Sequence, residues 1–150
     1  MINITDNQSW HIAVLDSIAR QVLGGDISGV SVGGQSIIHI TNDTQANRNN
    51  AQAIFDGFGD LAVSASVVSM TEGDTNPVVT CNDSAISGDA SLGYLVTMDG
   101  IEYASGTVDV TAGEATLTLT EPDEGDYIVY MWRATGDYAS GQAEITVNGV

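Results

Sequence analysis

The sequence predicts a mainly β protein, with an antiparallel β-sandwich over residues 61–150 preceded by a small α+β segment with one or two helices over residues 1–60. Apolar residues recur at helical spacing before residue 60 and alternate with polar residues after it. The chain of 150 residues also has 17 glycines and only 2 prolines. Many glycines between short apolar runs are typical of a turn-rich β fold.

The beginning of the chain has a helical pattern followed by a hairpin pattern. Four apolar residues recur at every fourth position: Trp10, Val14, Ile18 and Val22. This spacing predicts an amphipathic helix over residues 8–23. Short segments at residues 27–32 and 36–41 then flank Gly33 and Gly34, a pair that indicates a tight turn. We therefore expect a small hairpin after the first helix.

A second helix is predicted over residues 43–56, with Asp43 or Thr44 as its N-cap and Gly57 at its C-terminal end. Its first turns are polar, and its apolar residues gather at its C-terminal end. Tertiary packing supplies most of the stability of a helix. We therefore expect this helix to need an outside surface.

From residue 61 onward, strand patterns follow one another with turn signals between them. The predicted strands cover residues 61–70, 78–82, 92–98, 101–104, 107–110, 115–120, 127–133 and 142–147. Asp99-Gly100 is a strong signal for a two-residue hairpin turn. This succession of short strands predicts a sandwich or a barrel.

The segment Glu121-Pro122-Asp123-Glu124-Gly125-Asp126-Tyr127-Ile128-Val129 resembles the corner before strand F of immunoglobulin-like (Ig-like) domains. In this resemblance Tyr127 is the tyrosine-corner residue, whose hydroxyl bonds the backbone a few residues upstream. Cys81 falls on strand B, whereas Val129 stands in place of the second disulfide cysteine. Gly93-Tyr94-Leu95 replaces the core tryptophan of strand C.

The missing disulfide and tryptophan exclude an antibody-like domain. They suit the bacterial-type Ig-like domains that fold in a reducing cytosol. Such domains are frequent on tailed-phage capsid, tail-tube and fibre proteins, and also in bacterial adhesins. The resemblance covers residues 61–150. It predicts the fold better than the function, because proteins with the same sandwich fold have many unrelated functions.

The charge of the chain excludes several classes of partner. Asp and Glu total 20, whereas Arg20, Arg48 and Arg133 are the only basic residues apart from two histidines, which gives a net charge of −17. Nucleic acid binding requires cations that neutralise phosphates, and anionic membranes are disfavoured for the same reason. The first residues lack a signal-peptide pattern, and no apolar run is long enough for a membrane span. We therefore expect a protein made in a host cytoplasm, with no membrane insertion.

Enzymatic groups are scarce. The chain has two histidines, His11 and His39, and one cysteine, Cys81, which we expect to be a small buried hydrophobe in a strand. No spacing indicates a zinc site or a phosphate-binding loop. We expect no cofactor; the acidic loop with Asp123, Glu124 and Asp126 is a weak calcium candidate, and its alternative is a solvated acidic loop.

Two sets of residues are candidates for binding. Aromatic residues flank the predicted turn after residue 133: Tyr130, Trp132 and Tyr138. Exposed aromatic side chains at such a place suit sugar stacking or protein docking, and the alternative is that Trp132 packs under a loop. For docking of the first sixty residues, the candidates are Trp10, Arg48, Phe55 and Phe58.

These observations favour a non-enzymatic virion structural protein, such as a capsid decoration or a tail accessory subunit, that displays an Ig-like domain. Its expected partners are other virion proteins, in many copies or as a homo-oligomer. The alternatives are a glycan- or receptor-binding module, which is compatible with the first role, an adhesin or surface-layer subunit, and an enzyme. Paired carboxylates are the only catalytic groups in supply for an enzyme.

Overall fold

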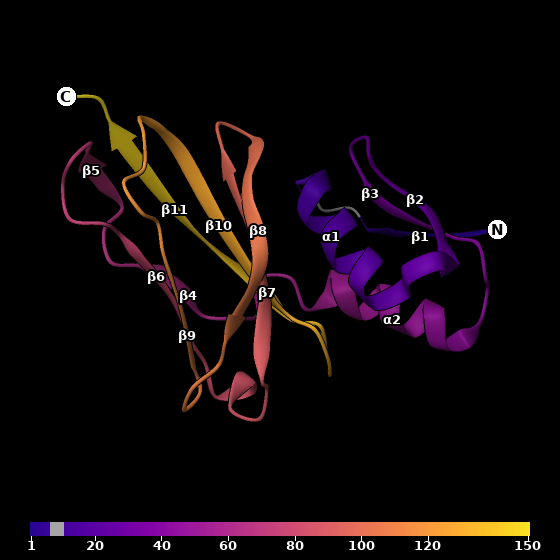
Figure 1. Cartoon of the computed structure of the whole chain (residues 1–150). Helices are drawn as coiled ribbons and strands as arrows, with labels where there is room; N and C mark the ends of the chain where they lie inside the picture. The colour runs from indigo at the N-terminus through magenta and orange to yellow at the C-terminus, as the bar shows by residue number, and fades with distance from the viewer. Residues whose placement is uncertain (7–10) are drawn as a thin grey trace. The chain divides into compact units, whose positions relative to one another are not determined.

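The computed structural model describes residues 1–6 and 11–150, which divide into two compact units. Unit 1 consists of Met1–Phe58 and Ala134–Ala139, and unit 2 consists of Gly59–Arg133 and Ser140–Val150. Figure 1 shows both α-helices in the N-terminal part and a two-layered arrangement of strands in unit 2. The chain is mainly β, with an Ig-like antiparallel sandwich after a small α+β unit.

Unit 1 packs two helices against one face of a three-stranded antiparallel sheet in the order β1-β3-β2. Its elements are β1 (Ile2–Asp6), α1 (Ile12–Leu23), a short 3-10 turn (Gly24–Asp26), β2 (Ile27–Val32), β3 (Ser36–Ile40) and α2 (Gln45–Asp56). The hairpin and both predicted helices are present. Helix α1 begins at Ile12 with His11 as its N-cap, and residues 8–10 of the predicted helix lie outside the described residues. Strand β1, which pairs with β3, was not predicted.

The core of unit 1 supplies the surface that α2 needs. Apolar side chains of both helices and of β3 are at most 2% exposed: Val14, Leu15, Ile18, Ala19, Ile38, Ile40, Ala51, Ile54 and Phe55. The expectation that α2 depends on an outside partner is therefore wrong, because α1 and the sheet cover its apolar face. Thr44 is the N-cap, and its hydroxyl accepts a hydrogen bond from the Asn47 backbone N–H at 3.1 Å.

Unit 2 is a sandwich of a five-stranded sheet, β5-β11-β10-β7-β8, and a three-stranded sheet, β4-β6-β9. The strands are β4 (Val63–Ala65), β5 (Ser69–Thr71), β6 (Val78–Asn82), β7 (Ser91–Met98), β8 (Ile101–Asp109), β9 (Glu114–Thr118), β10 (Gly125–Arg133) and β11 (Ser140–Asn148), with a 3-10 turn at Ser84–Ile86. All neighbours pair antiparallel except β5 and β11. The chain crosses repeatedly between the two sheets, and only β7–β8 and β10–β11 are consecutive strands that pair with each other. Such crossings are typical of the Greek-key sandwiches of Ig-like domains.

Two predicted stretches are divided into strands differently in the structure. The stretch 61–70 is two strands, because the chain crosses from one sheet to the other between β4 and β5. Residues 101–104 and 107–110, predicted as two strands, belong mostly to the single strand β8, which has a bulge at Tyr103. Asp99 and Gly100 form the predicted turn, with φ angles of 51° and 83°.

The core of unit 2 closes without a sulfur bridge. Cys81 is a free, fully buried cysteine on β6, as expected for a small core residue. Val129, at the position of the second disulfide cysteine of the Ig-like resemblance, is also fully buried. Burial raises the pKa of the Cys81 thiol to about 11, and the Asp83 carboxylate adds to the shift. The thiol is therefore protonated at neutral pH and has little nucleophilic character.

Candidate functional site

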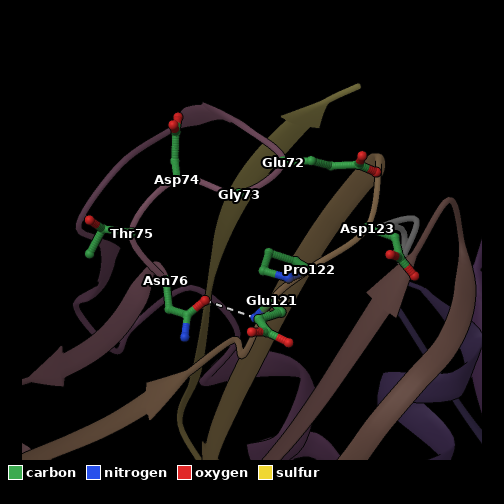
Figure 2. A pocket seen from close by; sticks show the side chains of 8 residues that line it. All are labelled: Glu72, Gly73, Asp74, Thr75, Asn76, Glu121, Pro122 and Asp123. Atoms are coloured by element: carbon green, nitrogen blue, oxygen red, sulfur yellow. Dashed lines mark hydrogen bonds between the residues drawn. The ribbon is translucent and has the colours of Figure 1, made fainter. Parts of the chain in front are cut away.

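Unit 2 contains an acidic pocket of about 480 Å³ between two loops. We call it the acidic pocket; its lining residues are Glu72, Gly73, Asp74, Thr75, Asn76, Glu121, Pro122 and Asp123. One loop follows β5, and the other connects β9 to β10 (Figure 2). The pocket therefore lies at the end of the sandwich where the predicted Ig-like corner is found.

Hydrogen bonds join the two loops that form the pocket. The Asn76 side chain accepts from the Glu121 backbone N–H at 2.8 Å, as Figure 2 shows. The Glu72 carboxylate accepts from the Glu124 backbone N–H at 2.5 Å. Charge-assisted bonds to backbone N–H groups are stronger than neutral ones. Two loops that lie far apart in sequence are therefore tied to each other at two places.

The tyrosine corner fixes the second wall of the pocket. The Tyr127 hydroxyl donates a hydrogen bond of 2.9 Å to the Asp123 carbonyl oxygen, which confirms the corner predicted from the sequence. The ring of Tyr127 is 1% exposed and meets the ring of Tyr103 edge to face at 5.3 Å. Burial raises the pKa of the Tyr127 hydroxyl, so the group stays protonated and continues to donate at neutral pH.

The chemistry of this pocket is that of a cation-attracting surface. Four carboxylates line it, from Glu72, Asp74, Glu121 and Asp123, and no basic side chain does. The calcium candidate is not supported by geometry, because the described residues contain no group of three or more carboxylate, histidine or cysteine side chains arranged to hold a metal ion. The Asp126 carboxylate instead accepts from the Thr146 hydroxyl at 3.1 Å.

The predicted aromatic surface is not exposed at two of its three residues. Tyr130 and Trp132 are each 4% exposed, and Tyr138, at the loop after β10, is half-buried. Trp132 lies against Gly93, its register partner on β7, so closely that a Cβ at position 93 would overlap the indole ring. The expectation of exposed stacking platforms at Tyr130 and Trp132 is therefore wrong. The Trp132 ring fits there only because Gly93 has no side chain.

The predicted docking residues have different surroundings from those we expected. Phe55 is 2% exposed and belongs to the core of unit 1, which corrects its assignment to a docking surface. Phe58 is half-buried. Arg48 is on the surface, where its guanidinium makes two bonds of 2.6 and 2.7 Å to the Asp43 carboxylate and lowers the pKa of that carboxyl. Trp10 lies outside the described residues.

A polar trio that the sequence did not indicate lies on the open face of the small sheet. The His39 Nδ1 atom is 2.7 Å from the Asn3 side-chain oxygen, and its Nε2 atom is 3.3 Å from the Ser31 hydroxyl. The three residues come from β3, β1 and β2, so only strand pairing brings them together. This arrangement fixes the orientation of the imidazole ring.

Unit 2 also contains a buried ion pair. The Arg133 Nε atom is 2.7 Å from the Asp89 carboxylate, and a second bond of 3.0 Å makes the pair bidentate. Their side chains are only 16% and 9% exposed. Because Arg133 is the only Lys or Arg in unit 2, every other strong charge of this unit is negative.

Comparison with known proteins shows likeness in fold alone. No protein-family model and no curated protein matches the sequence. A crystal structure of a CARDB domain from Pyrococcus furiosus, in complex with di-metal ions, is similar over 63% of this chain and 97% of that chain, at 18% identity and a TM-score of 0.39. A solution structure of this CARDB domain is similar at 15% identity and a TM-score of 0.36, over 61% of this chain and 96% of that chain.

A polysaccharide lyase is similar over 77% of this chain but only 15% of its own, at 13% identity and a TM-score of 0.42. At these values none of the structures carries an argument about what this chain does. No helix in the described residues combines the length and the apolar character of a membrane span.

Proposed function

We propose that the chain is a non-enzymatic virion structural protein, a capsid decoration or tail accessory subunit, that displays an Ig-like domain. The observation that carries the proposal is the disulfide-free closure of unit 2. Its tyrosine corner is intact, while Cys81 is alone and Val129 fills the place of its usual partner. This is the form of the domain that folds in a reducing cytosol, and the resemblance described above connects that form with tailed-phage virion proteins.

The charge distribution supports assembly in many copies. A net charge of −17 on 150 residues keeps the free subunits apart by mutual repulsion until a partner surface neutralises them. Unit 1 has a filled core, so it would attach through its surface rather than through an unfilled helix. A partner that neutralises such subunits carries positive charge.

Two residues with catalytic potential, Cys81 and His39, are engaged in structural contacts. The Cys81 thiol is buried with its pKa raised to about 11, and the His39 ring is held between Asn3 and Ser31. The glycan-binding alternative loses its two main stacking platforms, because Tyr130 and Trp132 are buried. Both observations favour a structural role over the alternatives.

The proposal is tested with particles produced from the genome that encodes the chain. We expect the chain to sediment with purified particles through a density gradient, at a fixed ratio to the most abundant shell protein. Particles made without the chain should take up the purified full-length chain until saturation. Recovery of the chain only at the top of the gradient, with no uptake by deficient particles, would refute the virion role.

A further inference from the structure

Strand β8 is the longest edge strand in the described part of the chain. It pairs only with β7 and runs over nine residues, whereas β5 at the opposite edge of the same sheet has three. An edge strand presents unpaired backbone N–H and C=O groups that can bind another strand. Natural edges are commonly blocked by lysine, by proline or by a bulge. Strand β8 contains neither lysine nor proline, and its bulge at Tyr103 leaves Ala104–Asp109 in continuous register with β7.

The side chains of β8 leave this edge accessible. Seven of its nine residues are exposed, and only Ala104 and Val108 are half-buried. Ile101 is 74% exposed and Tyr103 is 45% exposed, so an apolar patch lies at the beginning of the strand. Short side chains follow from Ala104 to Val108, and the Tyr94 ring of β7 lies against Gly106.

Carboxylates lie at both ends of this edge. Glu102 is at its beginning, next to the turn from β7. At its other end, Asp109 and Glu114 line a hollow of about 350 Å³. The single strong cation of unit 2, Arg133, is bound to Asp89. A segment that complements this edge is therefore extended, partly apolar and positively charged near both ends.

We propose that the β8 edge binds an extended, lysine- or arginine-bearing peptide segment of a partner protein by strand addition. Backbone hydrogen bonds supply the affinity in this mode, and flanking side chains supply the specificity. A second copy of the chain is the wrong occupant, because each copy has a net charge of −17. The inference goes beyond the proposed function, since it concerns a binding activity of the chain itself, whether or not the chain belongs to a virion.

The test uses the full-length chain and a fluorescent peptide as long as β8, with lysines at both ends and alternating valine and threonine between them. We expect saturable binding by fluorescence anisotropy, with amide shifts in β8 by NMR. A peptide with glutamates in place of the lysines should bind at least about tenfold more weakly, because it repeats the charge of the edge. A peptide methylated at alternate backbone nitrogens keeps every charge but cannot form the backbone hydrogen bonds to β8. Its affinity should therefore also be at least about tenfold lower.

Matched variants of the chain locate the site. Glu102→Gln combined with Asp109→Asn should weaken binding of the lysine peptide by about tenfold. Asp60→Asn combined with Glu144→Gln removes the same charge at exposed positions outside β8 and should change binding by less than about twofold.

Three results would overturn the inference. Equal binding of the methylated peptide would show ionic attraction without strand addition. Equal effects of the two variant pairs on peptide binding, or no binding at all, would show that the β8 edge is not the binding site. Sedimentation of the free chain as a dimer that the lysine peptide does not dissociate would identify a second copy as the occupant. The peptide comparisons use the unaltered chain, so they decide the question even if a variant fails to fold.

Discussion

Replacing Arg133 with methionine is expected to destabilise unit 2 severely. Arg133 and Asp89 form a bidentate pair at 2.7 and 3.0 Å with side chains only 16% and 9% exposed. Removing the guanidinium leaves a carboxylate with little access to water, and breaking a buried pair in this way costs about 3–5 kcal/mol. Domains have total stabilities of about 5–15 kcal/mol, so this is a large fraction. Methionine retains most of the apolar stem, which separates the charge effect from lost packing.

The assay is urea unfolding followed by tryptophan fluorescence and far-UV circular dichroism. A double-mutant cycle with Asp89→Asn isolates the pairwise energy, and the double variant should be more stable than Arg133→Met alone. The matched control is Arg20→Met, which breaks the exposed pair with Asp16, whose side chains are 63% and 37% exposed. That change should cost less than about 1 kcal/mol. A loss below about 1 kcal/mol for Arg133→Met, or no recovery in the double variant, would refute the reasoning.

Three further substitutions or modifications test the interior of unit 2. Tyr127→Phe removes the 2.9 Å bond to the Asp123 carbonyl and should cost about 1 kcal/mol by urea unfolding, and an unchanged midpoint would argue against the corner. Gly93→Ala should cost about 1–3 kcal/mol, because the new Cβ overlaps the Trp132 ring; a smaller residue at 132 should reduce that cost, and an equal cost would exclude this clash. Because burial raises the pKa of the Cys81 thiol from 9.0 to about 11, the native chain should react with a thiol reagent at pH 8 at least about 100-fold more slowly than the chain unfolded in urea. The free energy of unfolding should fall as the pH rises through 9 to 11, because the unfolded chain loses the thiol proton first. Fast labelling of the native chain would contradict the burial of Cys81.

Local rules predicted much of the fold from the sequence. The Thr44 cap, the Asp99-Gly100 turn and the Tyr127 corner each depend on a few neighbouring residues, so their sequence signals were sufficient. Strand β1 was missed because its pattern is short, and its pairing with β3 is a long-range contact that no local signal encodes. Residues 61–70 read as one strand because the crossing between sheets leaves the alternation of side chains intact.

The candidate site was less predictable, because burial depends on partners distant in sequence. Trp132 is buried with the help of a glycine on the neighbouring strand, and alternation along β10 alone cannot reveal that partner. Phe55 belongs to a core shared with α1, which the polar first turns of α2 concealed. The acidic pocket joins Asn76 and Glu121 from two loops whose proximity follows from strand order.

Residues 134–139 belong to unit 1, although the strands on either side of them belong to unit 2. Ala139 is 2% exposed, and a Cβ at Gly57 would come within 2.9 Å of its Cα atom. If the chain is divided after Phe58, the first fragment therefore lacks residues 134–139 of its own unit. The second fragment contains these residues but not the rest of the unit to which they belong. Dissecting the protein requires excising the loop as well, with a short bridge from β10 to β11 in its place.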